Sequence, residues 1–266
     1  MRDDKELVES FLGPIRECAE YRPAFGHSDS AGVDLQGFLD LYGGAPFYAW
    51  IGLDTPLVYA AHKAAGGLTS VYRQIGVGTE RLLRDIMKDA LGLSSEQTSW
   101  KYEYSKGGGK KGVHVLDAKI AFDDLAESRR TVFREWLSST GPIVGLSNKK
   151  RERIEGVVFE IRQGYKSADS KRQNADVRFG MSAYQEGLLP TLLILSRQVS
   201  ETVVERYRRD NMAVLTGTLA DDARTSTFAF FKHVVGYDLV AFFERNSVAI
   251  KSEVRKIVQG LLGADQ

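Results

Sequence analysis

The stretch Gly156-Val-Val-Phe-Glu-Ile-Arg-Gln-Gly164 decides the fold. Its side chains alternate, with Val157, Phe159 and Ile161 on one face and Val158, Glu160, Arg162 and Gly164 on the other. A period of two predicts a half-buried β-strand. After Gly164 the chain becomes polar, and residues 166–178 carry lysines, arginines and an asparagine. We therefore predict a central strand that brings a carboxylate and a lysine to the mouth of a site, followed by a basic segment.

Composition limits the classes of protein to consider. A chain of 266 residues with 43% hydrophobic residues can bury a sizeable core. Its 36 Lys and Arg nearly balance 35 Asp and Glu, which excludes a generally polycationic protein but allows a local basic face. Cys18 is the only cysteine, so an intrachain disulfide and a cysteine-built zinc site are excluded. The sequence lacks a long apolar run and begins with charged residues, so we expect a cytoplasmic protein outside the membrane.

Periodicity predicts a mixed α/β protein. We expect a single domain, 1–266, with a helical N-terminal part over about 1–95, a core over about 96–220 and C-terminal helices over about 225–266. Thr79 is predicted to cap a helix within 69–91, and breaks are expected near Gly236 and Asn246. The other expected helices are 3–20, 35–42, 124–138, 170–187 and 200–209, and the expected strands are 99–105, 112–121, 155–164, 190–196 and 212–216.

Two carboxylates suggest phosphodiester chemistry. Asp117 lies toward the end of a predicted strand, and Glu160 lies among apolar residues of another. A buried carboxylate rarely stays unpaired, and Mg²⁺ binds through one or two carboxylates together with water. A nearby lysine would orient the attacking water and offset charge. The pattern therefore favours a magnesium-dependent hydrolase of phosphodiesters.

The run from Glu160 to Asn174, with Leu116-Asp-Ala-Lys-Ile120 upstream, resembles type II restriction endonucleases of the PD-(D/E)XK superfamily, and is similar to the subgroup that reads CC/GG-containing palindromes. The resemblance implies a nuclease core built on a mixed central sheet flanked by helices. It implies that Asp117 and Glu160 bind Mg²⁺ and that Lys166 is the catalytic lysine. It also implies that Ser167, Lys171, Arg172 and Asn174 enter a DNA groove, where Arg and Asn can read base edges.

The spacing departs from the usual motif, in which acid and lysine are two residues apart on one strand. Here Gly164 stands two before Lys166, and Glu160 lies about 20 Å from Lys166 on an extended strand. A bulge at Gly164 would shorten that distance. Other arrangements stay open. Glu160-Ile-Arg162 could be the motif with Arg in place of Lys, Lys166 could take its acid from Glu80 or Glu186, or Asp117-Ala-Lys119 could work with Glu103.

Charge is consistent with a DNA-facing segment, since residues 148–178 contain nine Lys or Arg and five Asp or Glu. We expect an endodeoxyribonuclease that cuts duplex DNA at a short palindrome, acts as a homodimer and is accompanied by a cognate DNA methyltransferase. A non-catalytic DNA-binding or regulatory protein on the same fold is the alternative from another class, and a structure-dependent repair nuclease is a third.

Overall fold

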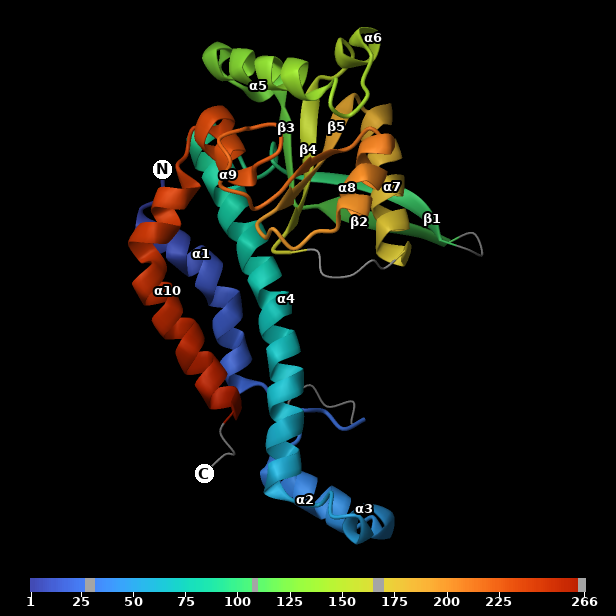
Figure 1. The fold of residues 1–266 in the computed structure, drawn as a ribbon, viewed down its shortest axis with the longest axis vertical. Helices are drawn as coiled ribbons and strands as arrows, with labels where there is room; N and C mark the ends of the chain where they lie inside the picture. The colour runs from blue at the N-terminus through green and yellow to red at the C-terminus, as the bar shows by residue number, and fades with distance from the viewer. Residues whose placement is uncertain (27–31, 107–109, 165–169, 263–266) are drawn as a thin grey trace. The chain divides into compact units, whose positions relative to one another are not determined.

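The computed structural model describes residues 1–26, 32–106, 110–164 and 170–262 (Figure 1). Its contacts divide the chain into two compact units. We name residues 1–3 and 79–244 the sheet unit, and residues 4–78 and 245–266 the helical unit. Two helices, α4 (Pro56–Leu91) and α10 (Leu239–Leu262), contribute residues to both units.

The sheet unit is built on a mixed four-stranded sheet of order β3-β4-β5-β6. Its strands are β3 (Ala118–Ala121), β4 (Gly156–Arg162), β5 (Leu188–Ile194) and β6 (Ala213–Leu215). Strand β3 runs antiparallel to β4, whereas β4, β5 and β6 are parallel. A separate hairpin pairs β1 (Trp100–Lys106) with β2 (Lys110–Leu116). The expected mixed α/β fold with a central sheet and flanking helices is confirmed.

Helices cover both faces of this sheet. They are the end of α4, α5 (Glu127–Thr140), α6 (Asn148–Arg151), α7 (Ser170–Gln185), α8 (Glu201–Arg209) and α9 (Thr227–Phe230), with a 3-10 turn at Phe122–Asp124 and a π-helix at Phe231–Val235. On one face, Val158 of β4 packs with Phe179 of α7 and Tyr207 of α8. On the other, the rings of Phe159 and Phe230 lie 5.8 Å apart. Burial on both faces explains why every residue of β5 is buried.

The predicted strand 112–121 is interrupted at Asp117. Strand β2 ends at Leu116, Asp117 forms a bend, and β3 begins at Ala118. The pairing partner changes at the same point, because β2 pairs with β1 while β3 pairs with β4. The prediction of one continuous strand is therefore wrong. Alternation of side chains alone does not reveal where a strand leaves one partner for another.

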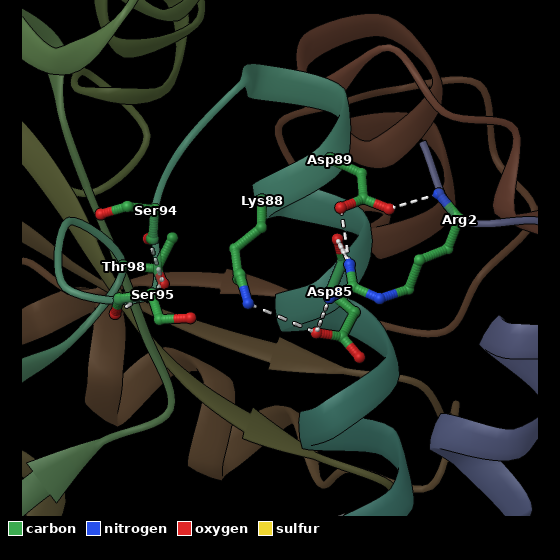
Figure 2. A network of polar contacts seen from close by, with 7 residues as sticks. All are labelled: Arg2, Asp85, Lys88, Asp89, Ser94, Ser95 and Thr98. Carbon is green, nitrogen blue, oxygen red and sulfur yellow. Dashed lines mark hydrogen bonds and ion pairs between the residues drawn. The ribbon is translucent and has the colours of Figure 1, made fainter.

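Arg2 fixes the start of the chain to α4 within the sheet unit (Figure 2). Its backbone N–H and its Nη1 each donate to Asp89 at 2.6 Å, and its Nη2 lies 3.3 Å from Asp85 Oδ1. Lys88 Nζ lies 3.8 Å from the same Asp85 oxygen. Because α-helices have 3.6 residues per turn, Asp89 points about half a turn away from Glu80. The network therefore holds α4 from the side opposite Glu80.

The helical unit consists of α1 (Asp4–Arg16), a 3-10 turn at Glu17–Glu20, α2 (Leu35–Gly43), α3 (Pro46–Trp50), the first part of α4 and the last part of α10. Two expectations for its helices are wrong. Thr79 lies inside α4, which begins at Pro56, so it caps no helix. Asn246 does not break α10, because its Nδ2 donates to Asp4 Oδ2 at 2.9 Å while the helix continues to Leu262. Among the described residues, no helix is both long and apolar enough to cross a membrane.

Two glycines of α4 give a matched pair of variants. At Gly76 an added Cβ meets nothing within 4 Å, whereas at Gly78 it would lie 2.1 Å from the carbonyl oxygen of Phe11. We expect Gly76→Ala to stabilise the protein by about 0.5–1 kcal/mol, because alanine favours a helix interior. Gly78→Ala should destabilise it by about 1–3 kcal/mol, because the backbone of α1 must move. Urea unfolding of both variants measures these changes, and equal effects would contradict this close contact.

Candidate active site

The bend at Asp117 and the end of β4 meet at one edge of the sheet. In the antiparallel register Ala118 pairs with Phe159, so Asp117 lies next to the carboxyl end of β4. Its Oδ2 accepts a hydrogen bond from the backbone N–H of Ile161 at 2.7 Å. The carboxylate thus occupies the place where the β3 backbone would otherwise provide the next acceptor. Strand pairing therefore places Asp117 next to Glu160 in the register of β3 and β4.

The surroundings of Asp117 disfavour its charged form. Burial, followed by the negative charge of Glu80, raises the pKa of Asp117 from 3.8 to about 7. The hydrogen bond from Ile161 and the positive charges of Arg84 and Arg162 act in the opposite direction. A carboxyl group that titrates near neutral pH in a partly buried cluster is typical of functional sites.

Glu80 joins this cluster from α4. Burial and then the negative charge of Glu160 raise the pKa of Glu80, and Arg84, Arg162 and Arg81 oppose them. Arg84 stands four residues after Glu80, hence on the same side of the helix. Glu80 is therefore electrostatically coupled to both Asp117 and Glu160, which brings three carboxylates from three elements to one place in the sheet unit. We name them the carboxylate cluster.

Arg162 lies on the same face of β4 as Glu160. Its Nη2 is 3.0 Å from Glu160 Oε1 and 2.7 Å from Asp176 Oδ1 of α7. The hydroxyl of Tyr207, on α8, donates to the other oxygen of Asp176 at 2.6 Å. Because the Arg162 and Asp176 side chains are only 10% and 6% exposed, their geometry is restricted. The structure thus brings together the Glu160-Ile-Arg162 arrangement, with arginine beside the carboxylates.

Other predicted site residues are placed as follows. Lys166 and Ser167 lie outside the described residues, as do the side chains of Lys171 and Arg172, whose backbone forms the first turn of α7. Asn174 is exposed on α7, and its Oδ1 accepts a hydrogen bond from Arg206 at 2.6 Å.

The other candidate site residues are the acids Glu103 and Glu186 and the alternative lysine, Lys119. The side chain of Glu103 also lies outside the described residues. Glu186 accepts a hydrogen bond from Trp100 and stands beside the start of β5, which pairs with Gly156 at the far end of β4 from Arg162. The structure therefore does not bring Glu186 to the carboxylate cluster. Lys119 pairs with Val158, two residues before Glu160, and is half-buried.

The donor chemistry of the cluster suits a hard divalent cation. Carboxylate oxygens are the ligands that Mg²⁺ prefers. A positive ion would offset both the burial and, second to it, the negative charges that raise the pKa of Asp117 and Glu80. Across the described ranges, no three His, Cys, Asp or Glu side chains are arranged to cage an ion. Mg²⁺ commonly takes only one or two carboxylates and completes its shell with water and substrate phosphate. Asp117 and Glu160 could provide these one or two carboxylate ligands.

A separate cavity of about 740 Å³ lies between α6, α7 and α8. Its wall includes Ile154, Gly187 and Asn211, which lie near the starts of β4, β5 and β6. The carboxylate cluster lies at the other end of β4, so the cavity and the cluster are different places. In open sheets with parallel strands, ligands bind at the carboxyl ends, which favours the cluster as the functional site.

Comparisons with known proteins add no relative. No protein-family model, no curated protein and no solved structure matches the chain.

Tyr207→Phe tests the Arg162 network. The variant removes the hydroxyl that donates to Asp176 and should destabilise the protein by about 1.5–3 kcal/mol, because a hydrogen bond to a buried charged group is lost. Asp123→Asn, at an exposed position outside the network, should change the free energy of unfolding by less than about 0.5 kcal/mol. Urea unfolding gives both values, and a Tyr207→Phe protein as stable as its control would contradict the network.

Proposed function

We propose that the protein is a type II restriction endonuclease, a Mg²⁺-dependent enzyme that hydrolyses phosphodiester bonds of double-stranded DNA at a short specific site. The observation that carries this proposal is the electrostatic coupling of Glu80 to both Asp117 and Glu160, beside Arg162, at one edge of the sheet. Carboxylates that repel one another at a cost in free energy suggest a role beyond packing. The resemblance of residues 160–174 to PD-(D/E)XK nucleases supports the same reading.

In this proposal Asp117 and Glu160 hold Mg²⁺ through their oxygens, and Glu80 adds negative charge from α4. When bound, Mg²⁺ polarises the phosphate and lowers the pKa of a coordinated water. Arg162 places a fixed positive charge beside Glu160, where it can offset charge that develops on the phosphate. Lys166 remains the predicted catalytic lysine, and Arg162 is the described residue best placed for that role.

The DNA-facing surface in this proposal is the start of α7. Lys171 and Arg172 lie in its first turn, and Asn174 follows on an exposed position. Ser167 precedes the helix on the way from β4. Lysines would hold phosphates and fix the register, whereas Arg172 and Asn174 can read base edges in the major groove. A palindromic, GC-rich site would match a homodimer, and a cognate methyltransferase in the same cytoplasm would protect host DNA.

Digestion of unmethylated DNA tests the proposal. We expect the purified protein to cut plasmid or phage DNA into discrete fragments with Mg²⁺, and to leave it intact with EDTA. Sequencing of the ends then gives the recognition site. A smear in place of bands would favour the structure-dependent repair nuclease. Binding without any cleavage across a panel of genomic DNAs would favour the non-catalytic DNA-binding protein.

A further inference from the structure

The helical unit exposes a group of large apolar side chains on neighbouring elements. Leu41 belongs to α2, Phe47, Tyr48 and Trp50 to α3, Ile51 follows α3, and Leu57 lies in the first turn of α4. We name these six residues the α3 patch. Trp50 is 83% exposed, Leu57 80% and Phe47 64%. Figure 1 shows α2 and then α3 near the start of α4.

The elements that carry the α3 patch are joined by packed aromatic side chains. Phe38 of α2 and Tyr59 of α4 are fully buried, with ring centroids 5.6 Å apart. Tyr42 stacks on Tyr48 at 4.7 Å, which connects α2 to α3. Asp34 caps α2 by accepting a hydrogen bond from the N–H of Gly37. The exposed side chains therefore stand on a packed aromatic layer, which lowers the entropy lost on binding.

The size of the α3 patch suits a protein interface. If a large side chain offers about 150–250 Å², the exposed fractions of the six residues amount to about 500–900 Å². The largest apolar patch on a typical monomer is about 300–600 Å², and a stable interface buries about 800 Å² on each partner. One copy of the α3 patch is therefore large enough to form one side of such an interface.

The charged residues near the α3 patch limit which kinds of molecule could bind to it. Residues 23–62 contain no Lys or Arg and four Asp, and residues 41–53 contain no charged residue at all. A surface of this composition lacks the cations that hold DNA phosphates or anionic lipids. Asp34 and Asp40 already accept hydrogen bonds from Gly37 and Gln36 at the edge of α2, where a polar rim would stay hydrated.

We propose that the α3 patch is the contact through which two copies of this chain form a homodimer. Two copies of one apolar patch can face each other across a two-fold axis, which buries the aromatic side chains of both. This dimer contact rests on the proposed function in that a nuclease cutting a palindrome would use it, but sedimentation measures mass only. A protein without nuclease activity could therefore still dimerise through the α3 patch. A monomeric protein could still have its active site at the carboxylate cluster.

Sedimentation of the full chain tests this proposal. We expect the wild type to sediment at twice the 29.6 kDa chain mass at micromolar concentration. Trp50→Asp should raise the dimer dissociation constant at least about 100-fold, since aromatic anchors at an interface centre contribute several kcal/mol. Val248→Asp is the matched control, because Val248 is 81% exposed on α10, and it should remain dimeric. Circular dichroism checks that both variants are folded.

Salt and lipid separate the possible outcomes. Because the α3 patch is apolar with an acidic rim, high salt should strengthen the dimer, whereas salt weakens contacts to phosphate. A wild-type monomer, or a Trp50→Asp dimer as tight as the wild type, would overturn the proposal. Flotation of the wild type with phosphatidylcholine vesicles, lost in Trp50→Asp, would overturn it in favour of a membrane contact.

Discussion

Asp117→Asn should lower the rate of Mg²⁺-dependent DNA cleavage by about 10³-fold, which is the size of effect expected when a preorganised electrostatic group is removed. The amide keeps an oxygen that can accept the hydrogen bond from Ile161, so the bend between β2 and β3 should persist. What is lost is the negative charge that would hold the cation. Single-turnover cleavage of a plasmid with saturating Mg²⁺ measures the change directly.

Two further variants complete the cleavage test. Glu160→Gln should show a loss of similar size, because it removes the other proposed ligand. Asp123→Asn is the matched control, since Asp123 is an exposed acid six residues away along the chain, and it should cut like the wild type. Equal rates for Asp117→Asn and its control would place the chemistry elsewhere. Calcium in place of Mg²⁺ should support DNA binding while slowing cleavage, which would separate the two steps.

Asp117→Asn should also make the metal-free protein more stable at alkaline pH. The pKa of Asp117 is raised to about 7 in the fold, mainly by burial, against 3.8 ordinarily. Between these two values the folded chain keeps a proton that the unfolded chain has lost. The part of the stability that depends on Asp117 is therefore fully present below about pH 4 and is lost as pH rises to about 7. The contribution of Asp117 is on the order of 2–4 kcal/mol, and Asp117→Asn should recover most of it at pH 8.

Urea unfolding in EDTA across this pH range measures the effect. The slope of stability against pH should be more negative for the wild type than for Asp117→Asn between about pH 4 and 7. Glu80, whose pKa is also raised, acts in the same direction and leaves part of the slope in place. Asp123→Asn should retain the full slope. A variant that loses cleavage and gains stability cannot be dismissed as misfolded, so this experiment also supports the first one.

Much of the core could be predicted from local pattern. The alternation around Glu160 predicted β4, and the apolar run after Pro190 predicted β5, because these signals depend on near neighbours in the chain. The limits of α4 could not be read, since its glycines and Thr79 resemble boundaries and only tertiary packing carries the helix through them. The prediction of a break near Asn246 was wrong for a related reason. The Asn246 side chain donates a hydrogen bond to Asp4 of α1, and α10 continues through this position.

The candidate site divides in the same way. Asp117 was proposed because it lies toward the end of a predicted strand, and Glu160 because it lies among the apolar residues of another, and both signals are local. Glu80 could be named only as one of several acids, because its approach to the sheet depends on how a distant helix packs. Arg162 was similarly an alternative to Lys166, and the distance of 3.0 Å to Glu160 is a fact of three-dimensional structure. Local pattern thus predicts which strands carry candidate site residues, but it does not predict which side chains from distant elements lie next to those residues.

The hydrogen bond from the Ile161 amide to Asp117 gives the protein a built-in spectroscopic reporter. A single backbone proton, distant in sequence from the carboxyl group, senses whether that group is ionised, because an anion is the stronger acceptor. Isotope labelling of isoleucine alone would let one resonance follow ionisation, cation titration and the arrival of substrate in an otherwise unmodified chain.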